Sequence, residues 1–232
     1  MIRKTIFLLI SFWVFTSFSL AVETYIIDTP TVGILSYGSY NINFRCFSEG
    51  NTISKVDFGV LKLLNLGVSW EFDSFISNKN IKFTIPALSV KLKIYEGNMT
   101  FPAVTIGYDG QGYFIDNNSN SGYKEVGKGL YIVMSREFFI DGLTLSVGAN
   151  INKLSKIKIY GFVNAIVPIY KEFLYFMAEY DNINYLPLAR LNFGLKFSVT
   201  EYVDIDCIVR DCCGRSGVQG ERVFKIVHSN KF

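Results

Sequence analysis

The sequence has little of what most enzymes and helical membrane proteins need. It contains one histidine, His228, and only 19% of its 232 residues are charged. No serine signature accompanies that histidine, and we see neither a glycine-rich phosphate loop nor a Cys/His metal spacing. The net charge of +3 is too small for a nucleic-acid-binding surface. We therefore expect no catalytic residue, cofactor, metal or nucleic-acid partner.

Long apolar runs are also missing. Beyond the first twenty residues, no stretch of about 18 residues is continuously apolar, which excludes a polytopic helical membrane protein. Half of all residues are nevertheless hydrophobic, 16% are aromatic, and the mean hydropathy is +0.26. A chain of this composition buries apolar surface or immerses it in lipid, so it is not an intrinsically disordered protein.

The N-terminus has the features of a secretory signal peptide. Arg3 and Lys4 precede an apolar stretch over residues 6–15, and small residues surround a cleavage position after Ala21. The alternative is an N-terminal membrane anchor, although the apolar stretch is short for a spanning helix. We predict a signal peptide at 1–21, an N-terminal periplasmic segment at 22–36 and a barrel at 37–232.

Alternation of apolar and polar residues dominates the remaining sequence and indicates strands with two different faces. It is strict in residues 38–46, 64–73, 88–94, 143–151 and 190–198. It is weaker in 54–61, 103–114, 129–137, 157–167, 173–181, 203–210 and 223–232. Two of these, 129–137 and 157–167, are apolar on both faces for part of their length. No segment shows a sustained helical period, so the chain is predicted to be all-β.

The predicted connections are alternately long and short. This layout is typical of a closed antiparallel transmembrane β-barrel in the bacterial outer membrane, here of about 12 strands. Such a barrel must close because an open sheet edge in lipid leaves backbone groups unpaired. The C-terminal Phe232 suits recognition by the barrel-assembly machinery, and outer-membrane lipid is the second expected partner. A soluble β-sandwich or a periplasmic lipocalin-like binding barrel is the alternative.

The polar positions of the strands are expected to face the lumen. They are Asn43, Arg45, Ser69, Glu71, Lys91, Lys93, Asp109, Gln111, Glu179, Asp181, Arg190, Asn192, Lys196, Asp204 and Asp206. Their charges either pack a filled lumen as ion pairs or line a narrow polar conduit. We therefore expect a narrow channel or an envelope scaffold, and an outer-membrane hydrolase is less favoured because His228 has no partner signature.

Four cysteines are unusual in such a barrel. Cys46 and Cys207 lie on apolar positions of their strands and are expected to act as small hydrophobic residues. Cys212 and Cys213 are adjacent in a predicted loop, where free thiols or disulfides with a partner chain are both possible.

Several short phrases resemble the YjbH-like outer-membrane proteins, a bacterial group linked to exopolysaccharide production. They are residues 28–30, 37–40, 107–113, 128–131, 160–162, 178–182 and 220–222, which read DTP, YGSY, GYDGQGY, KGLY, YGF, AEYDN and GER. The resemblance implies an outer-membrane barrel, with polysaccharide-export components of the envelope as possible partners. The chain departs from the group in its short length and in its Cys212-Cys213 pair.

Overall fold

The structure is a computed structural model that describes residues 23–98, 100–116, 123–138, 142–154, 157–214 and 220–232. The predicted signal peptide, 1–21, lies outside the described residues. No helix among the described residues is long and apolar enough to cross a membrane. Regular structure is almost entirely β, with two short 3-10 turns, η1 (Ser48–Gly50) and η2 (Leu186–Leu188).

Twelve long strands form the barrel wall. They are β1 (Ser39–Phe47), β2 (Asn51–Leu61), β3 (Leu64–Asp73), β5 (Ala87–Tyr95), β6 (Ala103–Asp109), β9 (Gly129–Glu137), β10 (Thr144–Ile151), β11 (Ile159–Tyr170), β12 (Leu174–Asp181), β13 (Arg190–Ser198), β14 (Val203–Arg210) and β15 (Glu221–Lys231). Three short strands, β4 (Lys82–Phe83), β7 (Tyr113–Ile115) and β8 (Tyr123–Glu125), lie in the connections.

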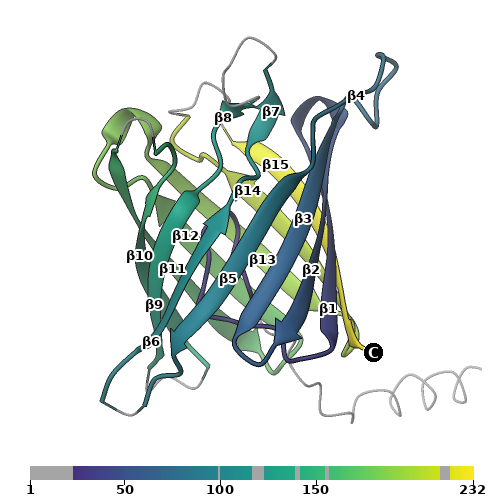
Figure 1. Ribbon diagram of the computed structural model, residues 1–232. Coiled ribbons are helices and arrows are strands. Elements are labelled where there is room, and N and C mark those ends of the chain that lie inside the picture. The colour runs from purple at the N-terminus through teal and green to yellow at the C-terminus, as the bar shows by residue number, and fades with distance from the viewer. Residues whose placement is uncertain (1–22, 99, 117–122, 139–141, 155–156, 215–219) are drawn as a thin grey trace, which may run out of the picture.

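The wall closes on itself, as predicted. Each long strand pairs antiparallel with its neighbours in sequence order, and β1 pairs with β15 from Ser39↔Lys231 to Cys46↔Phe224. Figure 1 shows the tilted strands as a complete barrel. The all-β closed antiparallel barrel expected from the alternation is therefore confirmed.

The two rims of the barrel differ. The long connections, including the β7–β8 hairpin and the segment with β4, extend from one rim, which we call the long-loop rim (Figure 1). Short turns such as residues 62–63 and 171–173 form the opposite short-turn rim. The C-terminus lies at that rim too, where the Phe232 amide donates to the Gly38 carbonyl at 2.9 Å.

One strand is shorter than predicted. We expected a strand over 103–114, but β6 ends at Asp109, and residues 113–115 form β7 of a separate hairpin. The Asp109 carboxylate accepts the Gln111 amide at 3.0 Å, a side-chain turn that leads the chain out of the ladder. The glycines on either side of Gln111 weaken strand propensity at the same point.

The outward and inward faces of the wall have opposite character. Outward residues are large and apolar, and they remain exposed around the whole circumference, as at Ile132 (47%) and Phe224 (43%). Inward residues are mainly polar and buried, including Lys196 and Asp206 at 1% and 0% exposure. The polar residues are therefore buried inside the barrel, and the apolar residues cover its outside.

The N-terminal segment fills part of the lumen. We predicted a periplasmic segment at 22–36, and in the structure most of residues 23–36 lie buried inside the barrel, so we call residues 23–36 the plug. They contact inward residues on opposite sides of the wall, including Lys91 on β5, Glu179 on β12 and Lys225 on β15. The plug then leaves along β2 because Gly59 has no side chain there: a Cβ on Gly59 would lie 2.1 Å from the Ser36 carbonyl oxygen.

Candidate functional site

The plug forms a narrow hairpin inside the barrel. Tyr25 and Pro30 form an isolated antiparallel bridge, and the Thr31 amide donates to the Thr24 carbonyl at 3.1 Å. The Ile26 amide donates to the Thr29 carbonyl, also at 3.1 Å, and so closes the tip. Because Pro30 has no N–H, its position in the hairpin leaves no donor unpaired. The tip, residues 26–29, contacts four charged residues of the wall, Arg45, Glu179, Arg210 and Lys225.

Apolar packing holds the tip against one side of the wall. Ile26 and Ile27 are each 1% exposed and belong to a buried cluster with inward residues of six strands. These inward residues are Phe47, Ile53, Ile166, Tyr175, Met177, Ile208 and Val223. Val32 packs on a second inward cluster of Tyr131, Val133 and Phe162. Burying each isoleucine contributes about 1.5 to 3 kcal/mol, so the plug is docked by a matched apolar surface.

Glu179 binds the backbone of the tip. Its Oε2 accepts the amides of Ile27, Asp28 and Thr29 at 3.3, 2.9 and 2.8 Å. The Thr29 hydroxyl donates to the same oxygen at 2.7 Å, and Asn192 donates to Oε1, also at 2.7 Å. Successive amides that converge on one oxygen form an anion-binding nest. The carboxylate therefore fixes the conformation of the tip as well as its position.

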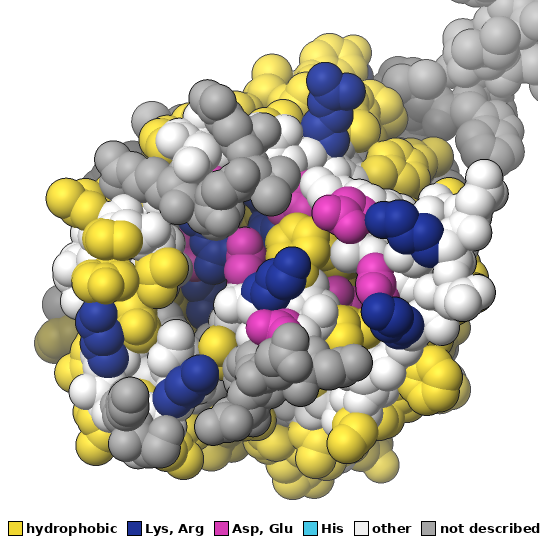
Figure 2. Space-filling model, turned by 90° about the horizontal axis from the view of Figure 1, so that it is seen from above, with side chains coloured by type: hydrophobic (Ala, Val, Ile, Leu, Met, Phe, Trp, Pro, Cys, Tyr) yellow, Lys and Arg dark blue, Asp and Glu magenta, His cyan; other side chains and the backbone are white. Residues whose placement is uncertain are grey.

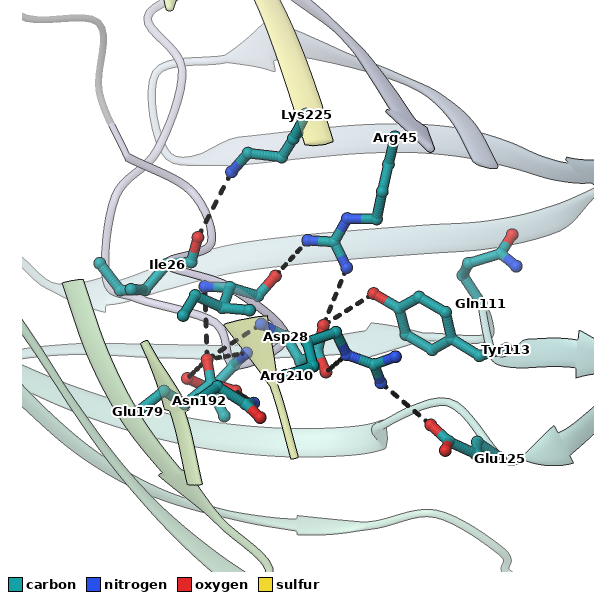
Figure 3. A network of polar contacts seen from close by, with 12 residues as sticks. Ile26, Asp28, Arg45, Gln111, Tyr113, Glu125, Glu179, Asn192, Arg210 and Lys225 are labelled. Carbon is teal, nitrogen blue, oxygen red and sulfur yellow. Dashed lines mark hydrogen bonds and ion pairs between the residues drawn. The ribbon is translucent and has the colours of Figure 1, made fainter. Parts of the chain in front are cut away.

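Asp28 binds the opposite charges of the wall. Its Oδ1 accepts Arg45 Nη1 at 2.8 Å and the Tyr113 hydroxyl at 2.7 Å, and its Oδ2 accepts Arg210 Nε at 2.7 Å. Figure 3 shows these groups converging on the carboxylate. Burial acts to raise the pKa of Asp28, but Arg210 and Arg45 outweigh it and hold that pKa well below its usual value. Asp28 is therefore ionised at neutral pH.

Other wall cations bind the plug through its backbone. Lys91 donates to the Thr24 carbonyl at 2.6 Å, Lys225 to the Ile26 carbonyl at 3.3 Å, and Arg45 to the Ile27 carbonyl at 2.5 Å. Nearer the start of the plug, Glu23 pairs with Lys196, which also lies 3.2 Å from Asp204. Lumen charges are thus compensated partly by the plug and partly by one another.

The β7–β8 hairpin reaches the same point from the long-loop rim. Tyr113 on β7 lies beneath the Arg210 guanidinium, 4.0 Å from ring centroid to Cζ. Glu125 on β8 pairs with Arg190 and, at 3.0 Å, with Arg210. Figure 3 shows Tyr113 and Glu125 approaching Arg210 from the hairpin side. Plug and hairpin therefore meet around Arg210 and Asp28.

An open cavity remains above the plug, which we call the vestibule. Its volume is about 200 Å³, and its lining includes Asp28, Arg45 and Tyr113. Further up, Lys55 pairs with Asp109 at 2.9 Å and Lys128 with Asp181 at 2.5 Å. Seen from the long-loop rim, acidic and basic side chains gather in the central hollow, and apolar side chains surround it (Figure 2). The vestibule therefore suits a small polar solute.

The structure places the predicted lumen residues as follows. Asn43, Arg45, Ser69, Glu71, Lys91, Asp109, Glu179, Asp181, Arg190, Asn192, Lys196, Asp204 and Asp206 lie on the inward positions of their strands. Lys93 shares that parity but is only half-buried near the short-turn rim. Gln111 lies in the connection after β6, where its side chain donates to the Gly112 carbonyl at 2.7 Å. The tip of the plug brings together Arg45, Glu179 and Asn192.

Sequence analysis missed several residues of the site. Lys55, Asp57 and Lys225 are inward and buried, and they occupy the polar positions of strands with weak alternation. Their place on the polar positions of these strands was the sequence signal that could have identified them. Asp28 was missed because it belongs to the plug, and Tyr113 because it was assigned to the wall.

The four cysteines are free thiols. Cys46 and Cys207 face outward on either side of Phe224, which pairs with both. Cys212 and Cys213 follow β14 in the long-loop connection, and Cys213 is exposed. In the described part of the chain, no three His, Cys, Asp or Glu side chains group as metal ligands.

No protein-family model and no curated protein matches the chain. Among solved structures, the chain is similar to the porin NanC, with a TM-score of 0.46 and 13% identity over 83% of this chain and 99% of that one. It is also similar to the N-terminal β-barrel domain of OprF from Pseudomonas aeruginosa, with a TM-score of 0.24 and 10% identity over 85% and 100%.

Proposed function

We propose that the protein is an outer-membrane barrel whose narrow lumen is closed by its own N-terminal plug. Small polar solutes enter the vestibule from the long-loop side, and passage through the barrel requires the plug to move. The observation that carries this proposal is the arrangement of the two faces: an apolar exterior around a charged lumen that holds the plug.

The apolar exterior supports insertion into a membrane. Exposed outward residues at mid-strand include Ile106, Ile132, Val147, Val163 and Leu195. They form a continuous belt, whereas water-soluble monomers rarely expose apolar patches larger than a few hundred Å². A soluble lipocalin-like barrel has the opposite arrangement, with an apolar ligand cavity and a polar surface. The belt therefore favours the membrane barrel over the soluble alternative.

The orientation follows from the two rims. Outer-membrane barrels have short turns on the periplasmic side and long loops outside the cell. The vestibule then opens to the exterior, and the plug enters from the periplasmic side. Aromatic rings cluster at the short-turn rim: Phe58 stacks on Phe232 with ring centroids 6.4 Å apart, and Tyr40 contacts Phe232 at a tilt with centroids 4.9 Å apart. Aromatic residues are typical of this interface.

The contents of the lumen support a closed resting state. The plug buries Ile26 and Ile27 and engages charged residues from β1, β5, β12, β14 and β15. A general diffusion pore has an open lumen, whereas the plug occupies this one and leaves a vestibule of about 200 Å³. Passage without movement of the plug is therefore expected to be small.

A link to exopolysaccharide traffic is part of the proposal and rests on the YjbH-like phrases. Under this proposal, polysaccharide-export components of the envelope are partners of the barrel. Deleting the gene should lower the exopolysaccharide that cells release, and wild-type protein supplied in trans should restore it. Unchanged release would remove this part of the proposal and leave the plugged barrel intact.

The membrane proposal has a direct experiment. Protein expressed with its own N-terminus should sediment with outer membranes and should migrate faster on a gel before heating than after. Closed barrels keep their fold in detergent until they are heated, which explains the expected shift. Recovery as a soluble periplasmic protein with no heat-dependent shift would contradict the proposal.

A further inference from the structure

We propose that Arg45, Arg210 and Tyr113 form a carboxylate-binding site, which Asp28 of the plug occupies as a tethered internal ligand. Small solutes that carry a carboxylate compete with Asp28 for this site from the vestibule. The inference rests on the proposed function, because it names the chemical class of solute that the vestibule accepts.

The geometry is that of a built anion site. Three donors from three different elements reach the Asp28 carboxylate at 2.7 to 2.8 Å, and together they use both of its oxygens. The side chains of Arg45 and Arg210 are 8% and 0% exposed. Charge-assisted hydrogen bonds in such a buried setting are among the strongest that proteins make with carboxylates.

Arg45 makes the site depend on an anion. Among the described residues, Asp28 is the only carboxylate paired with Arg45. Arg210 differs, because it also pairs with Glu125 and Glu221 on the wall side. If Asp28 leaves, Arg210 keeps two partners, whereas Arg45 becomes a buried cation without an acidic one. A buried cation in that state strongly favours a replacement anion.

The site is accessible from one direction. Asp28, Arg45 and Tyr113 line the vestibule, and below them the apolar contacts of Ile26 and Ile27 fill the lumen. The vestibule of about 200 Å³ accommodates a sugar-sized solute. Its lining also carries Lys55–Asp109 and Lys128–Asp181 pairs, which supply polar partners for hydroxyl groups.

Asp28 competes with free carboxylates for this site and so sets how tightly they bind. Asp28 is attached to the barrel, so its effective concentration at the site is high, on the order of millimolar or more. A free carboxylate therefore binds the wild-type protein weakly, and its binding weakens the hold on the plug. A neutral solute of the same size gains nothing from Arg45 and does not compete.

The experiment uses the full-length barrel folded in detergent, with D-glucuronate as the probe and D-glucose as its neutral counterpart. Isothermal titration calorimetry compares wild type with Asp28→Ala. We expect Asp28→Ala to bind glucuronate about 10- to 100-fold more tightly than wild type does, because charge-assisted contacts of this strength become available. Glucose should bind equally weakly to both proteins. Heat-dependent gel mobility shows that each variant is folded.

Two further variants locate the binding. Asp28→Ala combined with Arg45→Gln should lose the gain in glucuronate affinity. Asp204→Ala removes another buried lumen carboxylate, which pairs with Lys196, and should bind glucuronate as wild type does. Equal glucuronate binding by wild type and Asp28→Ala, or a gain that survives Arg45→Gln, would overturn the inference.

The failure of the inference can be separated from failure of the proposed function. If Asp28→Ala conducts ions better than wild type in planar bilayers but does not bind glucuronate, the plugged channel is supported and the carboxylate-binding site is contradicted. If Asp28→Ala binds glucuronate but no variant conducts, the site stands and the barrel is a receptor, not a channel.

Discussion

The Tyr113 hydroxyl donates a 2.7 Å hydrogen bond to Asp28 Oδ1, across 85 positions of sequence. This bond joins the β7–β8 hairpin of the long-loop rim to the plug, which enters from the short-turn rim. The lumen therefore holds two elements, one from each rim, that contact each other. We therefore expect movement of the hairpin to displace the plug, and movement of the plug to displace the hairpin, through the contacts of Asp28 and Arg210.

The first prediction concerns Glu179, which anchors the backbone of the plug. Glu179→Gln removes the negative charge that accepts three backbone amides of the plug. In one of the two orientations of the new side-chain amide, its NH₂ group faces those backbone donors. Hydrogen bonds to charged groups contribute about 1.5 to 3 kcal/mol each, so opening of the plug should increase about 10- to 100-fold. Hydrogen exchange of a peptide that covers residues 24–31 measures this increase.

The control for Glu179→Gln is Glu137→Gln. Glu137 is exposed at the end of β9, so the same chemical change there should leave exchange of the plug unaltered. If the Glu179 variant exchanges no faster than the Glu137 variant, the amide nest does not hold the plug.

The second prediction concerns acid. The folded pKa of Asp28 is lowered, so its contribution to docking of the plug is fully present above the unfolded value of about 3.9. That contribution is lost as the pH falls below this value toward the folded pKa. After correction for the intrinsic exchange rate at each pH, the difference in exchange of residues 24–31 between wild type and Asp28→Asn should therefore be constant from neutral pH to about 5 and should shrink below about 4. Asp28→Asn should lack this component, and an identical acid response in both proteins would contradict the role of Asp28.

The third prediction tests which face meets lipid. Ile132 lies outward at the middle of β9, and Leu61 lies at the short-turn end of β2, 59% exposed. Arginine at the bilayer midplane costs about 2 to 4 kcal/mol, but near the interface about 0 to 1. In denaturant titrations of the barrel folded into lipid vesicles, Ile132→Arg should therefore lose much more unfolding free energy than Leu61→Arg. Equal losses would mean that Ile132 does not lie in the lipid core.

The barrel wall could be predicted from sequence because its two faces meet different environments. In residues 64–73 and 190–198, polar residues alternate with apolar ones because the polar side chains face the lumen and the apolar side chains face outward. The boundary at Asp109 could not be predicted in this way, because Tyr113 and Phe114 continue an apolar pattern after the ladder has ended. The strand ends there because the Asp109 carboxylate accepts the Gln111 amide and so turns the chain out of the ladder.

The plug could not be predicted from alternation, because a hairpin inside a lumen has no lipid face. A signal was nevertheless present in the strands that receive it. Residues 129–137 and 157–167 are apolar on both faces because Val133, Phe162 and Ile166 point inward. These three residues belong to the two buried apolar clusters that pack against Ile26, Ile27 and Val32 of the plug. Inward apolar residues in an otherwise polar lumen indicate that another segment fills it.

The fourth prediction concerns orientation. Cys213 is exposed in the long-loop connection after β14, whereas Cys207 faces outward on β14 itself. With the other three cysteines replaced, a membrane-impermeant maleimide should label Cys213 on intact cells. A variant that keeps only Cys207 should react only after the barrel is unfolded, because lipid covers that thiol. Labelling of Cys213 that requires broken cells would place the long-loop rim in the periplasm.

The central claim is that the plug closes the lumen, and single-channel conductance in planar bilayers tests it most directly. The comparison is between wild type and a variant in which residues 24–31 are replaced by a glycine-serine sequence of the same length. Both proteins should show heat-dependent gel mobility as evidence of a closed wall. We predict little or no conductance for wild type and a several-fold larger, stable conductance for the variant. Equal conductance of the two proteins would contradict the account.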